Sequence, residues 1–184
     1  MKPDLELMND EDSGVRYEVA KRIGAEHLPK MMNDENLRVR EEIAKRIGSE
    51  GGAFANEHLP KMMNDRDYYV RYEVAKRIDP KYLPKMMKDK DDYVRLEVAR
   101  RIAVEHLPKM MNDKDWYVRR EVAKRIDPKY LPKMMNDENY YIRYEVAKRI
   151  DPKFLGEMFG FDFDPKYQMG LIKVLAERED LRRV

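Results

Sequence analysis

The chain has 184 residues, of which 40% are charged, yet its formal net charge is only +2. This length is sufficient for one sizeable core, and the interleaved signs leave no overall charge to attract nucleic acid or a membrane surface. The lack of cysteine excludes disulfides, thiolate metal sites and a cysteine nucleophile. The sequence has no apolar run of about 18 residues and no signal-peptide pattern. We therefore expect a cytoplasmic protein that does not enter a membrane.

Along the chain, one nine-residue pattern, "VRYEVAKRI" and its variants, recurs six times. The recurrences are 24 residues apart, except for one interval of 31, and they begin at Val15, Val39, Val70, Val94, Val118 and Ile142. The long interval contains the extra segment "SEGGAFA", Ser49–Ala55, which we expect to extend the link between the two elements of the second repeat. A unit this short cannot bury its own apolar face, so the repeats must stack on one another.

Each repeat should contain two short elements, as the fifth repeat illustrates. Val118, Val122 and Ile126 are spaced as the buried side of a helix, which the pattern predicts from about Asp115, the N-cap, to Ile126. The helix should stop at "DP", because the residue before proline resists the α conformation. The following "YLPKMM" contains a proline of its own, which favours a short 3₁₀ segment. The paired methionines of this segment are best explained as core.

The pattern predicts an all-α solenoid, a superhelix of six repeats of about 24 residues. We expect one domain over 1–184, with an N-terminal half-repeat at 1–14, six repeats at 15–158 interrupted by the insertion 49–55, and a C-terminal cap at 159–184. The cap should hold a helix that begins at Asp164 and Pro165 and turns four side chains inward: Tyr167, Leu171, Val174 and Leu175. Only "LELM" covers the amino end, so self-association is expected there, although the oligomeric state stays open.

The repeat resembles the leucine-rich repeat variant family. The resemblance rests on Asp-x-(Asp/Asn)-x-x-Val-Arg-x-x-Val-Ala-x-Arg, followed by Leu-x-x-Met, over about residues 5–158. It implies alternating α and 3₁₀ helices in a right-handed superhelix. The family is similar to HEAT repeats in its Asp-to-Arg spacing, although its units are shorter. The family's best-known member carries an iron–sulfur cluster on cysteines. This chain has no cysteine, so no cofactor is expected.

One arginine per repeat lies on the apolar face, where an unpaired charge would be costly. An aspartate precedes each of these arginines by six residues, which suggests a structural ladder of paired charges between repeats rather than a row of anion sites. The proposed ladder consists of Arg16, Arg40, Arg71, Arg95, Arg119, Arg143, Asp10, Asp34, Asp65, Asp89, Asp113 and Asp137.

The sequence offers little for catalysis or metal binding. It contains no threonine, and its two serines, Ser13 and Ser49, lie outside the regular helices, so an activated nucleophile is not expected. His27, His58 and His106 occupy one repeat position, and stacked helices about 10 Å apart would keep them too distant to share a zinc ion. We therefore predict no enzyme, no catalytic residue and no metal site.

The outer helix face should carry an aromatic and basic stripe over the last four repeats. Exposed tyrosines with cations are typical of protein hot spots, and they also suit nucleic-acid backbones. A solvated face on which the tyrosines lie flat beside lysine side chains is a further interpretation. We expect a protein-interaction or scaffold module with a protein partner. A nucleic-acid-binding repeat protein is the alternative, and an accessory of a redox system would follow from family analogy alone. The candidate residues are Tyr69, Tyr72, Lys76, Tyr93, Arg100, Tyr117, Arg120, Lys124, Tyr141, Tyr144 and Lys148.

Overall fold

The computed structural model describes residues 4–161, 170, 172–174 and 176–178. All regular secondary structure in these ranges is helical, with α-helices and 3₁₀ segments in alternation. The predicted α-solenoid fold is therefore confirmed. The chain divides into two compact units, Met1–Arg101 and Ile102–Val184. The expectation of one domain over 1–184 stays a prediction.

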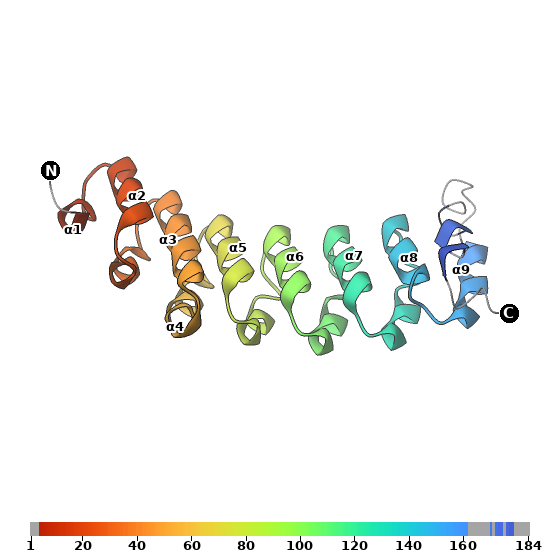
Figure 1. Ribbon diagram of the computed structural model, residues 1–184. Coiled ribbons are helices and arrows are strands. Elements are labelled where there is room, and N and C mark those ends of the chain that lie inside the picture. Colours follow the sequence, from red (N-terminus) through yellow and green to blue (C-terminus); the bar gives the residue numbers. More distant parts are fainter. Residues whose placement is uncertain (1–3, 162–169, 171, 175, 179–184) are drawn as a thin grey trace. The chain divides into compact units, whose positions relative to one another are not determined.

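The first unit contains successive helices that pack side by side, with the 3₁₀ segments at one end of them (Figure 1). Helices α2, α3, α5 and α6 are neighbours in this order, and α4 takes the place that a 3₁₀ segment has in the other repeats. The elements are α1 Asp4–Leu7, α2 Ser13–Arg22, η1 Ala25–Met31, α3 Leu37–Glu50, α4 Gly52–Met62, α5 Tyr68–Arg77, η2 Pro80–Lys85 and α6 Asp92–Arg101.

The second unit repeats the same arrangement, with α7 beside α8 and α8 beside α9. Its elements are η3 Val104–Met110, α7 Trp116–Arg125, η4 Pro128–Lys133, α8 Tyr140–Ala147, η5 Pro152–Phe154 and α9 Leu155–Phe161. Residues 170, 172–174 and 176–177 are also helical. Of the expected cap residues, Val174 is buried, and the other five lie outside the described residues: Asp164, Pro165, Tyr167, Leu171 and Leu175.

The helix ends follow from local sequence. Asp115 caps α7, because its side chain accepts hydrogen bonds from the backbone N–H groups of Tyr117 and Val118. At the other end Ile126 leaves the helical conformation, with φ of −56° and ψ of 150°, directly before Asp127–Pro128. The predicted bounds of this helix are confirmed. The proline is not essential to the stop, however, since α2 and α6 also end before an isoleucine but without a following Asp-Pro.

The insertion differs from the expected link. Ser49 and Glu50 extend α3, and the segment after the turn forms the first turn of α4, where Ala55 is buried. The turn consists of Gly51 and Gly52, with φ of 67° and 52°, values that favour glycine because a Cβ would be strained there. The extra residues therefore complete two α-helices, and the second replaces a 3₁₀ segment.

Deleting Ser49–Ala55 should lower the free energy of unfolding by no more than about 1 kcal/mol, and it could also raise it. The deletion joins Gly48 to "NEHLPKM", which matches the "GAEHLPKM" of the first repeat. The segment should then fold as η1 does, with a loss of only one or two turns of helical circular dichroism signal. Urea denaturation checks the stability. A collapse of helicity would show that the insertion is essential to the core.

The core is formed by the same apolar positions in successive repeats. In the fifth repeat Val118, Val122 and Ile126 are fully buried, as predicted, and so is Leu131 of η4. The first methionine of each pair is buried, and the second is half-buried in most repeats; Met134 and Met135 show the difference. The methionines thus fill the layer between the α-helices and the 3₁₀ segments.

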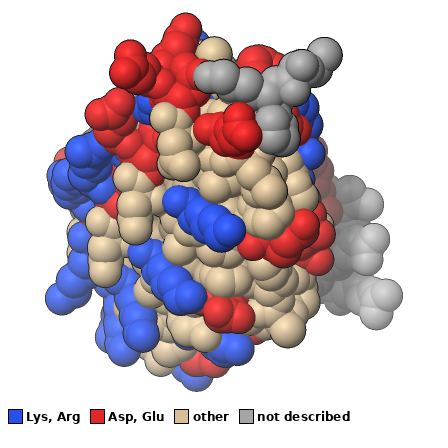
Figure 2. Space-filling view, turned by 90° about the vertical axis from the view of Figure 1, so that its left-hand side faces the viewer, with Lys and Arg blue, Asp and Glu red and all other residues tan. Residues whose placement is uncertain are grey.

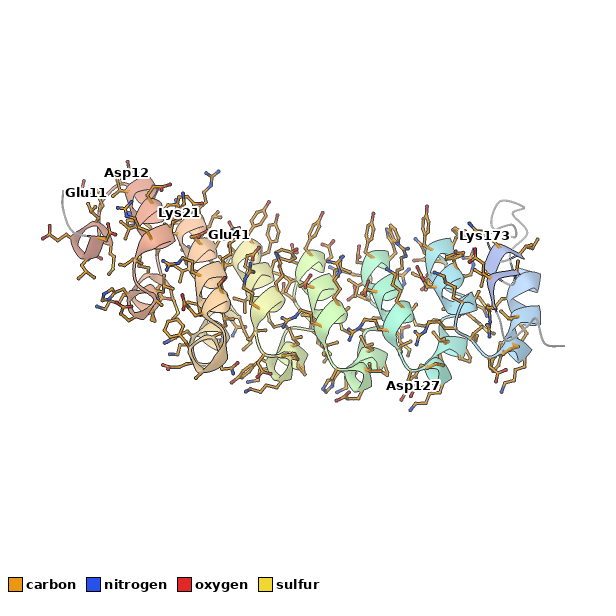
Figure 3. All side chains as sticks on the ribbon, viewed as in Figure 1. Glu11, Asp12, Lys21, Glu41, Asp127 and Lys173 are labelled. Atoms are coloured by element: carbon orange, nitrogen blue, oxygen red, sulfur yellow. The ribbon has the colours of Figure 1, made fainter. Side chains whose placement is uncertain are left out.

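Three 3₁₀ segments begin with a capping aspartate, and these groups should contribute a pH-dependent part of the stability. Asp127 lies where α7 ends and η4 begins (Figure 3). The backbone N–H of Lys129 donates to its carboxylate at 3.1 Å, and this bond lowers the pKa of Asp127 below the ordinary value of 3.8. Asp79 and Asp151 have the same arrangement and a lowered pKa.

We expect the carbon chemical shift of the Asp127 carboxyl group to titrate with a midpoint below 3.8. Because the folded pKa lies below the unfolded one, the stabilisation is complete above the unfolded pKa and is lost as the pH falls through the folded pKa. In an Asp127→Asn variant this part of the acid dependence should disappear. A midpoint at or above 3.8 would contradict the capping role.

The amino end of the first unit presents charged and uncharged side chains together. Figure 2 shows acidic side chains gathered at the top of this face and basic ones along its left side, with both basic and acidic side chains among the uncharged residues between them. Leu5 of α1 is half-exposed. Self-association at this end stays a prediction.

Candidate functional site

The buried arginines join neighbouring repeats through the aspartates of the next repeat. Arg119 of α7 is 7% exposed. It donates from Nε and Nη2 to the two carboxylate oxygens of Asp137, at 2.8 and 3.1 Å. Its Nη1 donates to the backbone carbonyl of Asp113 at 2.8 Å. Arg119 thus uses the main chain of the aspartate in its own repeat and the side chain of the aspartate in the following repeat.

The first unit contains three rungs with the same two-pronged geometry. The Nε···Oδ2 distances are 2.7 Å for Arg16–Asp34, 2.8 Å for Arg40–Asp65 and 2.7 Å for Arg71–Asp89. The hydrogen bond to the aspartate raises the pKa of Arg16, Arg71 and Arg119 above the ordinary value. Arg95 and Arg143 are buried and donate to the carbonyls of Asp89 and Asp137.

The ladder aspartates also organise the start of each helix. The Asp137 carboxylate accepts the N–H of Asn139, which is the N-cap of α8. Asp10 and Asp113 accept the N–H of Asp12 and Asp115 in the same way; Asp12 lies at the start of α2 (Figure 3). The carboxylate of Asp137 therefore binds an arginine of the previous repeat and also stabilises the turn before the helix of its own repeat.

A second row of arginines was not singled out by the sequence analysis. Arg149, which lies two residues after the end of α8, donates to the carbonyls of Ala123 and Ile126, both at 2.8 Å, at the C-terminal end of α7. These carbonyls have no partner within their own helix, and a cation is favourable at that end. Equivalent bonds are made by Arg46 to Ala20, by Arg101 to Ala75 and Ile78, and by Arg178 to Ala147 and Ile150. The sequence did contain a signal for this row, because an arginine directly before the last isoleucine of the nine-residue pattern recurs in all six repeats.

The candidate face of the first unit is an aromatic surface, which we call the first aromatic face: Tyr68, Tyr69 and Tyr72 of α5 and Tyr93 of α6. Tyr69 and Tyr93 are 49% and 61% exposed. The four side chains line a pocket of about 340 Å³. Of the predicted cations, Lys76 lies 5.2 Å from the ring centre of Tyr72.

The second unit carries the second aromatic face: Trp116 and Tyr117 of α7 and Tyr140, Tyr141 and Tyr144 of α8. Tyr117 and Tyr141 are 52% and 51% exposed. The ring of Trp116 stacks on Tyr117, with centroids 3.7 Å apart, and also on Tyr141 at 5.6 Å. Tyr68, Trp116 and Tyr140 were missed by the sequence analysis, although all three directly follow an N-cap residue. The continuity of the two faces as one stripe stays a prediction.

The cations of both faces are paired with glutamates. Three of these acids, Glu73, Glu97 and Glu145, are buried. Arg120 of α7 contacts Glu145 of α8 at 3.0 Å, so one of these pairs also joins two repeats. The other pairs are Lys76–Glu73, Arg100–Glu97, Lys124–Glu121 and Lys148–Glu145. The candidate faces therefore offer aromatic area with little uncompensated positive charge.

The described residues contain no group of three or more histidine, aspartate or glutamate side chains that could hold a metal ion. His58 is buried against Phe54, with ring centroids 4.6 Å apart, which agrees with a packing role for this repeat position. No helix in the described part of the chain is long and apolar enough to cross a membrane.

Stacked α and 3₁₀ elements joined by buried arginine–aspartate pairs define a helical-repeat protein of the α-solenoid class. A solved leucine-rich repeat variant with a novel repetitive structural motif is 32% identical to this chain, over 95% of this chain and 72% of the other, with a TM-score of 0.82. The chain belongs to the leucine-rich repeat variant family.

Two other solved structures share the fold. YibA of E. coli is 21% identical over 95% of this chain and 78% of its own, with a TM-score of 0.59. The complex of CpcE and CpcF of phycocyanin lyase from Nostoc sp. PCC7120 is 16% identical, with coverages of 98% and 90% and a TM-score of 0.51. No protein-family model and no curated protein matches the chain.

Proposed function

We propose that the protein is a non-catalytic interaction or scaffold module that binds a partner protein through its aromatic faces. The observation that supports this most is a half-exposed or exposed tyrosine in the first turn of each of four successive α-helices: Tyr69, Tyr93, Tyr117 and Tyr141. Tyrosine and tryptophan provide large contact areas at a low cost in side-chain entropy and are enriched in binding hot spots.

The paired cations favour a protein over nucleic acid. A nucleic-acid surface gains affinity when lysine and arginine neutralise phosphates and release counterions. Here Arg120 and Lys148 both contact Glu145, so a phosphate would have to compete with a buried carboxylate. The glutamates keep the tyrosine surface close to neutral.

The first test is fluorescence anisotropy with labelled random-sequence single- and double-stranded oligonucleotides at low and physiological salt. We expect no binding tighter than about micromolar at physiological salt, because non-specific electrostatic binding weakens steeply with salt. Tighter binding that is lost in a Lys76→Glu, Lys124→Glu, Lys148→Glu triple variant would establish the nucleic-acid alternative instead.

The second test is capture of partner proteins from native lysate, with and without nuclease. A Tyr117→Ala, Tyr141→Ala double variant should lose the partners that wild type retains after nuclease treatment. Tyr130→Ala, which removes a ring from η4 away from the face, is the matched control and should retain them. Partners retained equally by the double variant would place the binding surface elsewhere.

A further inference from the structure

Three of the α-helices begin with a pair of neighbouring aromatic rings that contact each other. The ring centroids are 4.1 Å apart for Tyr68–Tyr69, 3.7 Å for Trp116–Tyr117 and 5.2 Å for Tyr140–Tyr141. The pair follows an N-cap residue each time, so the backbone beneath it is held by the cap. Rings positioned in this way lose little freedom when a ligand binds.

The first aromatic face has the chemistry of a site for an uncharged ligand. Four tyrosines line its pocket of about 340 Å³, a size near the lower end for ligand sites. Tyrosine hydroxyl groups have a pKa of about 10, so they are neutral at physiological pH. The surface combines flat apolar rings with hydroxyl groups that can donate hydrogen bonds.

A proline-rich segment is complementary to such a surface. In the polyproline II helix the backbone carbonyls have no internal partners, so they are available to hydroxyl donors on the protein. Proline has no N–H that would be left unsatisfied on an aromatic wall, and its ring packs flat on tyrosine or tryptophan. The helix is already extended before binding, which reduces the entropy lost.

The repeat spacing also matches this ligand. A polyproline II helix rises about 3.1 Å per residue and has three residues per turn, so the same face returns after about 9.3 Å. Neighbouring α-helices pack with their axes about 8–10 Å apart. A segment that runs from α7 to α8 would therefore bring one turn to each ring pair. The stacking of Trp116 on Tyr141 makes these two pairs one continuous platform.

We propose that each aromatic face binds a proline-rich segment in the polyproline II conformation, with successive turns of the segment on successive repeats. This inference rests on the proposed function, because it names the class of protein segment that the faces recognise. A single-stranded nucleic acid, which can also stack on aromatic side chains, is the competing ligand, and the compensated cations count against it.

Trp116 is the chain's single tryptophan, so it reports directly on the second aromatic face. Titration with decaproline should give a saturable change in its emission, and a ten-residue glycine–serine peptide should give none. The affinity should change by no more than about twofold between low and high salt, since no phosphate contact is involved. With labelled decaproline followed by anisotropy, Tyr141→Ala should weaken binding by about tenfold or more. Tyr130→Ala should stay within about twofold of wild type.

The outcomes separate this inference from the proposed function. If decaproline fails to bind the folded protein but the Tyr117→Ala, Tyr141→Ala variant loses its captured partners, the polyproline proposal is wrong and the interaction module stands. Salt-sensitive binding of oligothymidylate that Tyr141→Ala abolishes would overturn both. Decaproline binding that is unaffected by Tyr141→Ala would also overturn the assignment to this face.

Discussion

An Arg119→Ala variant should lose about 3–5 kcal/mol of unfolding free energy, because removing one partner of a buried ion pair leaves an uncompensated buried charge. Asp137 would keep only the N–H of Asn139 as a partner from this network, with its side chain 10% exposed. The carbonyl of Asp113 would lose its bond to the guanidinium as well. Urea denaturation followed by circular dichroism measures the loss.

Two matched variants make this result specific. Arg119→Lys keeps the charge but cannot bond both carboxylate oxygens and the Asp113 carbonyl at once, so it should lie between wild type and Arg119→Ala. Lys124→Ala removes an exposed cation from the same helix, and the ion pair it breaks should be worth only about 0.2–1 kcal/mol. Equal midpoints for Arg119→Ala and Lys124→Ala would show that the ladder does not stabilise the stack.

An Arg149→Ala variant should be destabilised by about 2–3 kcal/mol, because hydrogen bonds to charged groups contribute about 1.5–3 kcal/mol each and are not fully additive. The variant leaves the carbonyls of Ala123 and Ile126 without the guanidinium at the end of α7. It also removes a positive charge from a helix C-terminus, where cations are favourable.

The appropriate control is Arg38→Ala, which removes an exposed arginine from α3 and should change stability by no more than about 0.5 kcal/mol. Hydrogen exchange gives a local readout, since the last turn of α7 should lose protection in Arg149→Ala more than its first turn. Unchanged stability together with unchanged protection at Ile126 would contradict a stabilising role for the second arginine row.

Outside the second repeat, where α4 replaces the expected 3₁₀ segment, the pattern within each repeat was sufficient to predict its secondary structure and its core. The spacing of Val118, Val122 and Ile126 determines which side of the helix is buried, and Asp115 determines where the helix begins. These are local properties, since a helical period and a capping side chain act within a few residues of one another. The repeated arginine on an apolar face likewise predicted a paired partner, because an unpaired charge there would be too costly.

Only the tertiary structure decided which residues from different repeats meet. From the sequence, each ladder aspartate was expected to reach the arginine of its own repeat or of the next one. In the folded chain Arg119 instead contacts the carboxylate of Asp137 from the following repeat, together with the backbone carbonyl of Asp113. Arg149 reaches carbonyls 23 and 26 residues earlier, a separation that no local pattern encodes. The burial of Glu145 beside Arg120 also depends on how α7 and α8 stack. Contacts between repeats follow from helix packing, and this explains why the most exposed tyrosines of the aromatic faces were predicted while the ring that joins α7 to α8, Trp116, and the pairing of Arg120 with Glu145 were not.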